Sequence, residues 1–198
     1  MIALIFATNR EAQPFLQRAG LDTPASCDKT VFDLRPGKQI VVCICGMGPH
    51  DALNNTRCIL GEHQIDSVIN AGIAGALSGG RKAGDVFRIT STLAWDKNSG
   101  THQIDSDLFM HLSPASLATV EEPVFDSKRR REIAAIADLV DMEGAYIAQA
   151  CREKDIPFRA IKGVSDFAGE EDRKTLCDNL DIASAIIAET LWKELKHG

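Results

Sequence analysis

Long hydrophobic runs are absent from the 198-residue sequence. No stretch approaches the roughly 18 apolar residues that a membrane helix needs, so no membrane span is expected. Positive charge is also scarce, because 22 lysines and arginines stand against 28 aspartates and glutamates, for a formal net charge of −6. An acidic chain is not attracted to phosphate-rich surfaces, which argues against nucleic acid or an anionic membrane as a partner. The one basic run, at residues 128–131, is therefore expected to be a solvated helix face.

Signals for secretion or metal binding are missing as well. The apolar run at residues 2–7 has no basic leader and is too short for a signal peptide. The five histidines are scattered without ligand spacing, so no metal site is predicted. Among the six cysteines, only Cys43 and Cys45 are close, and on a strand both sulfurs lie on one face, too near in sequence for an ordinary disulfide. The cysteines are predicted to be reduced, buried thiols, as in a cytoplasmic protein.

What the sequence does contain is an alternation of strand and helix patterns. Its length and its 44% hydrophobic residues suit one domain, so residues 1–198 are predicted to form a single domain. Strand-like runs occupy residues 2–7, 31–34, 39–45, 67–71, 85–91, 139–141 and 158–165. Helical spacing follows a cap at Asn9 and recurs at residues 52–60, 128–137, 146–151 and 182–195. This alternation predicts an α/β fold, a three-layer α/β/α sandwich with a central mixed β-sheet.

Two stretches are less regular. The glycine-rich residues 72–75 are expected to form a bend that ends the strand at residues 67–71. The polar, serine-rich residues 94–122 are expected to be largely irregular, with one helical turn near residues 108–112. Between the second and third strand runs, Pro36 and Gly37 mark a hairpin turn.

Acidic residues stand where strands are expected to end, which is where α/β sheets bind ligands. Glu11 follows the first strand, Glu143 opens a helix, and Asp166 ends the last strand. A fourth acidic residue, Asp85, opens a strand and does not share this position. The plain alternative is that such residues cap helix N-termini.

Two glycine motifs accompany the carboxylates. They are Gly46-Met47-Gly48 and Gly72-Ile73-Ala74-Gly75, whose small residues let the backbone approach a ligand closely. Neither is a Walker loop, since no G-K-[ST] follows, and the first lacks the third glycine of the dinucleotide fingerprint. Taken alone, both motifs are equally compatible with structural turns.

Taken in order, these segments resemble the purine nucleoside phosphorylase superfamily. Within it they are similar to the nucleosidase branch, which includes 5′-methylthioadenosine/S-adenosylhomocysteine nucleosidases and futalosine hydrolases. The resemblance extends along nearly the whole chain, and its most specific segments are Met142-Glu143-Gly144-Ala145 and Ser165-Asp166. Residues 2–11, 46–48, 69–75 and 83–86 support it. It implies a nucleoside phosphorylase-like fold, no cofactor, no metal, and a homodimer or larger homo-oligomer.

The resemblance also implies roles for individual residues. Glu11 would activate the attacking water, while Asp166, supported by Ser165, would protonate or hydrogen-bond N7 of the departing purine. Glu143 would hold the ribose hydroxyls, with Met142 packing on the sugar. The residues expected around the base are Ile73, Ala74, Gly75 and, as a stacking ring, Phe125. Phe125 is equally compatible with a place in the core.

These roles suit the cleavage of an N-ribosidic bond. An oxocarbenium-like transition state needs a protonated leaving group and a water on the opposite face of the sugar. The pKa of Asp166 must therefore be raised, whereas Glu143 at a helix start is expected to stay ionised. The predicted activity is hydrolysis of a 5′-substituted purine nucleoside such as 5′-methylthioadenosine or S-adenosylhomocysteine, with release of the free base.

Alternatives remain at this stage. Futalosine hydrolase is one, because residues 72–75 and 142–145 resemble that group equally and the pocket-shaping residues 96–122 are shorter than usual in either group. Purine nucleoside phosphorylase is another, although Asn70 stands where phosphorolytic relatives place an arginine, which leaves Arg10 as the candidate phosphate ligand. A non-catalytic nucleoside-binding protein on the same fold, or an unrelated α/β domain, is a further alternative. The presence of all three acidic residues favours an enzyme.

Overall fold

The computed structural model describes residues 1–21, 29–97, 100–104, 107–166 and 173–197. In these residues, nine strands form one mixed sheet. The strands are β1 (Ile2–Phe6), β2 (Lys29–Arg35), β3 (Lys38–Ile44), β4 (Ser67–Ala76), β5 (Val86–Ala94), β6 (His102–Gln103), β7 (Ser113–Thr119), β8 (Leu139–Asp141) and β9 (Phe158–Asp166). The helices are α1 (Asn9–Ala19), α2 (Pro49–Glu62), α3 (Ser127–Ala134), α4 (Gly144–Arg152) and α5 (Arg173–His197).

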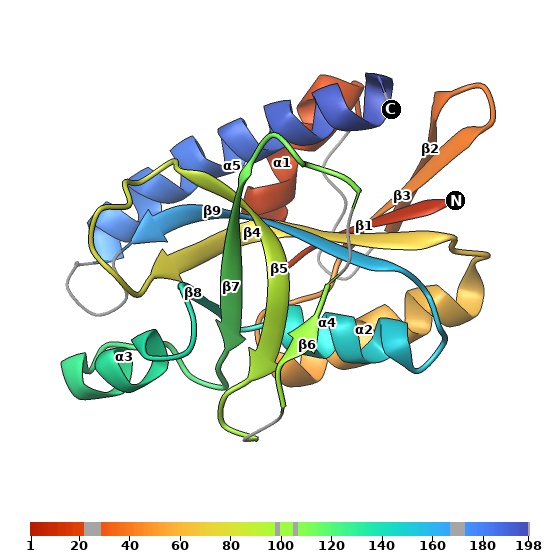
Figure 1. The fold of residues 1–198 in the computed structure, drawn as a ribbon. Coiled ribbons are helices and arrows are strands. Elements are labelled where there is room, and N and C mark those ends of the chain that lie inside the picture. The colour runs from red at the N-terminus through yellow and green to blue at the C-terminus, as the bar shows by residue number, and fades with distance from the viewer. Residues whose placement is uncertain (22–28, 98–99, 105–106, 167–172, 198) are drawn as a thin grey trace.

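The sheet has a parallel centre and closes on itself at one side. Strands β3, β1, β4 and β9 run parallel, and β2 pairs antiparallel with β3 through the predicted hairpin. Strand β9 also pairs with β5, β5 with β7, β7 with β8, and β8 with β4. These five strands therefore form a closed ring. In Figure 1 its members β5 and β7 cross in front of the central strands. The carboxyl ends of the four parallel strands lie at one edge, where a site was predicted.

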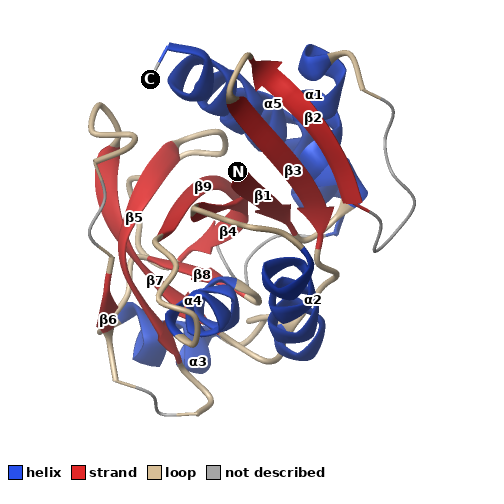
Figure 2. Cartoon of the chain, turned by 90° about the vertical axis from the view of Figure 1, so that its right-hand side faces the viewer, coloured by secondary structure: helices blue, strands red, loops and turns tan. Residues whose placement is uncertain are grey.

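Helices cover both faces of the parallel strands. Helices α1 and α5 lie on one side and α2 and α4 on the other, as Figures 1 and 2 both show. The side chains of β1 alternate accordingly: Leu4 and Phe6 pack with α1 and α5, while Ala3 and Ile5 pack with α2 and α4. The predicted three-layer α/β/α sandwich with a mixed sheet is confirmed.

The N-terminus of α1 differs from the prediction at its cap. Thr8, not Asn9, caps the helix: the Thr8 side chain accepts from the Glu11 backbone N–H, and the Glu11 side chain accepts from the Thr8 backbone N–H. This reciprocal capping box satisfies two backbone N–H groups that the helix start would otherwise leave open. Glu11 thus has the helix-capping role that the plain alternative gave to acidic residues at these positions.

Two predictions about strand limits were wrong. Strand β4 does not end in a bend at residues 72–75 but continues through Gly72 and Gly75, because both pair with β9. Residues 113–119, expected to be irregular, form β7 inside the ring, where the sheet neighbours β5 and β8 supply its hydrogen bonds. The expected helical turn at residues 108–112 is a turn in which Phe109 has a positive φ of 60° and its carbonyl accepts from Leu112 N–H.

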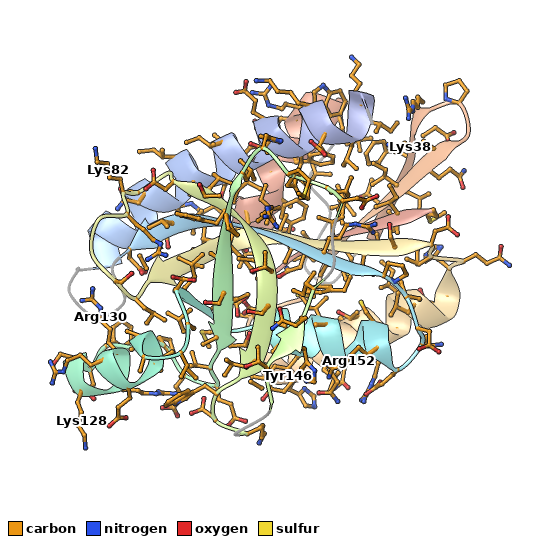
Figure 3. The ribbon with its side chains drawn as sticks, in the orientation of Figure 1. Lys38, Lys82, Lys128, Arg130, Tyr146 and Arg152 are labelled. Carbon is orange, nitrogen blue, oxygen red and sulfur yellow. The ribbon has the colours of Figure 1, made fainter. Side chains whose placement is uncertain are left out.

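The cysteine and basic-run predictions hold in part. Cys43, Cys45 and Cys151 are buried as predicted, whereas Cys58 is exposed on α2; Cys27 lies outside the described residues, and of Cys177 only the backbone, in α5, is described. The basic run is a surface feature: Lys128 projects outward from α3 (Figure 3) and is ion-paired with Glu132. Among the described residues, none of the helices combines the length and apolar character needed to cross a membrane.

Candidate active site

The Glu11 carboxylate lies at the junction of β1, α1 and β4. Its residue is only 5% exposed. Oε2 accepts from the backbone N–H and the hydroxyl of Thr8 at 2.8 and 2.9 Å, and Oε1 accepts from the Ile73 backbone N–H at 3.0 Å. The capping contacts therefore hold one oxygen, while the second oxygen faces strand β4. A carboxylate fixed in this way is pre-positioned for proton transfer.

Gly72 provides the room for this carboxylate. A Cβ at Gly72 would stand 2.8 Å from Glu11 Oε1 and 3.6 Å from Lys162 Nζ. Non-bonded contacts of Cβ atoms are essentially never shorter than 3.0 Å, so any larger residue at position 72 would shift the Glu11 carboxylate. Gly72, the first glycine of the motif, is thus explained by a close approach and not by a turn.

For the nucleosidase activity that the resemblance implies, replacing Gly72 with alanine is expected to reduce turnover by on the order of 10²-fold, because the new methyl group displaces the Glu11 carboxylate. The measurement is the initial rate of base release at saturating nucleoside. Gly61→Ala on α2 is the matched control, since nothing lies within 4 Å of its Cβ position. That control should keep full activity and gain about 0.5–1 kcal/mol of stability. Equal activity of the two variants would contradict the assigned role of Gly72.

The Glu143 carboxylate lies between β8 and α4, where its residue is 7% exposed. Its Oε1 accepts from the Gly48 backbone N–H at 2.7 Å. Gly48 has a φ of 89°, a conformation that favours glycine, so the Gly46-Met47-Gly48 motif presents this N–H to the carboxylate. Burial above all, and then the nearby Asp141 carboxylate, raise the pKa of Glu143 to about 7. The expectation that Glu143 simply stays ionised is therefore too simple, because the group titrates near neutral pH.

Two site residues were missed in the sequence. Asp141 and Lys162 form a buried ion pair, with Oδ2 of Asp141 2.8 Å from Nζ of Lys162. Asp141 also accepts from the Thr119 hydroxyl at 2.6 Å and from the Gly144 N–H at 2.9 Å. Burial alone would lower the pKa of Lys162, but the Asp141 and Glu143 carboxylates outweigh it and raise that pKa. A signal was available, since each residue interrupts an otherwise apolar strand run.

Asp166 and Ser165 end strand β9 at the same edge of the sheet. Asp166 pairs with Gly75 across a register shift in the β4–β9 ladder, and Ala74 pairs with Val164. Ser165 is 1% exposed, and Asp166 is partly buried. The structure therefore brings the ends of β4 and β9 together, and Ile73, one residue before Ala74 on β4, donates its backbone N–H to Glu11.

Met142 and Phe125 lie differently. Met142 is partly buried and packs against an apolar cluster that includes Leu77, Leu93 and Val140. Phe125 is 69% exposed, so the alternative that it is a core residue is wrong. A stacking role for Phe125 stays a prediction.

The remaining candidates have other partners. The Arg10 guanidinium is bound in a bidentate manner by Asp181 of α5, through contacts of 2.7 and 2.8 Å. Asp85 accepts from the Lys82 backbone N–H at 2.7 Å in the turn before β5. In the described part of the chain, no group of three or more histidine, cysteine or acidic side chains is arranged to hold a metal. The chemistry available at the strand ends is that of carboxylates and one buried lysine.

Comparison with known proteins gives a family match over most of the sequence. A family model described as "Phosphorylase superfamily" matches residues 1–118 and 106–195. A 5′-methylthioadenosine/S-adenosylhomocysteine nucleosidase of Bacillus subtilis is 28% identical over 211 residues, covering 92% of this chain and 91% of that protein. In solved structures, a nucleosidase of the same name from Helicobacter pylori has a TM-score of 0.87 at 18% identity, covering 100% of this chain and 98% of that one. A futalosine hydrolase of H. pylori has a TM-score of 0.85 at 19% identity, with coverage of 98% and 96%.

Proposed function

Because the chain belongs to the phosphorylase superfamily, we propose that it is a nucleosidase that hydrolyses the N-ribosidic bond of 5′-substituted purine nucleosides. 5′-Methylthioadenosine and S-adenosylhomocysteine are the proposed substrates. One observation carries this proposal: the buried carboxylates of Glu11 and Glu143 are fixed by backbone N–H groups at the strand ends where Asp166 also lies. The curated relatives carry the name of this activity and cover nearly all of the sequence.

In the proposed reaction the three acidic residues have separate tasks. Glu11 takes a proton from the water that attacks the anomeric carbon, and Asp166 gives a proton to N7 of the leaving purine, so the base departs neutral. Glu143 accepts hydrogen bonds from the ribose hydroxyls. The negative charge of Glu11 and Glu143 stabilises the positive charge that develops on the sugar. Ser165 supports Asp166, Met142 packs on the sugar, and the backbone of Ile73, Ala74 and Gly75 lies on the purine side, with Phe125 as the stacking ring.

The contacts of Arg10 favour hydrolysis over phosphorolysis. A phosphate ligand needs a guanidinium that is open to the anion, but Arg10 is held by both oxygens of Asp181. Asn70, at the position where phosphorolytic relatives place an arginine, is 1% exposed and donates to the Ile5 carbonyl at 3.1 Å. Neither residue offers phosphate a binding group next to the ribose.

The test is base release, followed by liquid chromatography, from 5′-methylthioadenosine, S-adenosylhomocysteine, futalosine, adenosine and inosine, each with and without phosphate. Release of adenine from the first two is expected at the same rate with and without phosphate, and Arg10→Ala should match the wild type. A rate that requires phosphate and yields ribose 1-phosphate would overturn hydrolysis. Preference for futalosine would move the protein to the second nucleosidase class, whose fold it shares. Release from none of the five would favour a non-catalytic binder.

Wider aspects of the proposal follow from the same features. The unbroken pairing from β2 to β6 supports one nucleosidase domain over residues 1–198. Met47 and Phe125 are 70% and 69% exposed, and large apolar side chains in this state support a homodimer or larger homo-oligomer. The buried thiols of Cys43, Cys45 and Cys151 support a cytoplasmic location.

A further inference from the structure

A single lysine lies among the carboxylates of the site. Lys162 is 2% exposed, and its Nζ is 2.8 Å from Asp141 Oδ2. Around it are three buried acidic residues, Glu11, Asp141 and Glu143, none more than 7% exposed. In the described part of the site, Lys162 is the cation that balances this negative charge.

The Lys162 ammonium group lies close to other site residues besides its ion-pair partner, Asp141. Lys162 is paired in register with Gly72 of the neighbouring strand β4. Glu11 Oε1 and Lys162 Nζ both lie within 4 Å of the point where a Cβ of Gly72 would stand. Lys162 is therefore ion-paired with the Asp141 carboxylate on β8 and has the Glu11 carboxylate on α1 close by. A compact ammonium suits this position, since one point charge serves several carboxylates.

The groups that act on Glu143 come from three elements and one loop. Asp141 on β8 and Glu11 on α1 repel its ionised form, whereas Lys162 on β9 attracts it. The Gly48 N–H, in the loop after β3, donates to it, and the thiol of Cys45 lies close enough that Glu143 helps to raise the pKa of this cysteine. After burial and Asp141, Lys162 has the largest effect on the pKa of Glu143, and it is the one that lowers it most.

We propose that Lys162 is a positioning residue of the reaction, which acts through Glu143 and sets the lower pH limit at which the enzyme binds and cleaves its nucleoside. This inference rests on the proposed function, because the ribose contact of Glu143 belongs to that proposal. Stability alone does not account for a lysine in the middle of β9. A buried ion pair is often no more stabilising than apolar side chains of the same volume.

The experiment measures kcat/KM for 5′-methylthioadenosine between pH 5 and 9 in the wild type and three variants. In the wild type, the acidic limb of the pH profile, where kcat/KM falls as the pH is lowered, should lie near the Glu143 pKa of about 7. Lys162→Met keeps the length of the side chain but removes the charge, and should move the acidic limb up by about 1–3 pH units. Lys162→Arg keeps the charge and should leave the limb in place. Asp141→Asn removes the repulsion instead, and should move the limb down.

The two opposite shifts distinguish an electrostatic role from a structural one. A purely structural role would lower kcat/KM at every pH and leave the limb unchanged, and this result would overturn the inference. If Lys162→Met does not fold, as circular dichroism would show, Lys162→Gln takes its place, because its neutral amide can still donate a hydrogen bond to Asp141. A limb that stays in place in Lys162→Gln overturns the inference. If the wild type releases no base, the proposed function is overturned instead. If the wild type hydrolyses the nucleoside but the acidic limb stays in place in the variants, only the role of Lys162 is overturned.

Discussion

Replacing Asp166 with asparagine is expected to reduce base release by roughly 10²–10⁴-fold, the range in which general acid catalysis contributes. The asparagine side chain can donate a hydrogen bond to N7 of the purine, but it cannot transfer a proton. The departing base would therefore leave as an anion, at a higher barrier. The rate is measured by chromatography of free adenine from saturating 5′-methylthioadenosine.

The fold should not change in this variant. Asp166 takes part in the β4–β9 ladder through its backbone, which the substitution leaves unaltered. Asp85→Asn is the matched control, because its carboxylate caps a turn at Lys82 and has no place in the proposed reaction. This control should keep wild-type turnover. Full activity of Asp166→Asn would remove Asp166 from the mechanism.

Glu11→Gln is expected to stop turnover while the protein still binds adenine. The amide cannot accept the proton of the attacking water, but its oxygen can still accept from the Ile73 N–H, and the purine-side residues at the ends of β4 and β9 are unchanged. Rates come from single-turnover measurements and binding from calorimetric titration with adenine. Loss of adenine binding with normal turnover of bound substrate would show that the role given to Glu11 is wrong.

Glu11 also stabilises the helix it opens, so the two effects need to be separated. Its carboxylate accepts three hydrogen bonds, from Thr8 N–H, Thr8 Oγ1 and Ile73 N–H, and glutamine retains one acceptor oxygen for them. Thr8→Ala removes the hydroxyl but leaves the carboxylate. Both variants should lose on the order of 1 kcal/mol of stability. Only Glu11→Gln should lose turnover as well, and equal loss in both would assign Glu11 to the helix alone.

The sequence predicted those features that depend on neighbours along the chain. Apolar runs marked the strands, and the rule that ligands lie at the carboxyl ends of parallel strands directed attention to Glu11, Glu143 and Asp166. The cap at Thr8 was also within reach, since Thr8 and Glu11 have the spacing of a capping box. Choosing Asn9 instead overlooked this reciprocal pattern.

The features that were missed depend on partners distant in the sequence. Strand β7 contains Ser113, Pro114 and Ser116, which favour loops, and it becomes a strand because β5 and β8 lie on either side. Gly72 and Gly75 weaken a strand locally, yet β9 holds them in the ladder. The pair of Asp141 and Lys162 joins two strands that are not neighbours in the sheet, so the residues are recognisable as unusual but not as partners.

The closed ring of strands has a consequence for the order in which the site is assembled during synthesis. Strand β9 pairs with both β4 and β5, and it carries Lys162 and Asp166. A growing chain that has emerged only to α4 already contains Glu11 and Glu143, but it has neither Lys162 nor the proposed acid, Asp166. The partners in the β4–β9 ladder are about ninety residues apart, and such distant pairings form late and slowly. The proposed site is thus completed in a final step, when the last strand closes the ring and α5 packs against it.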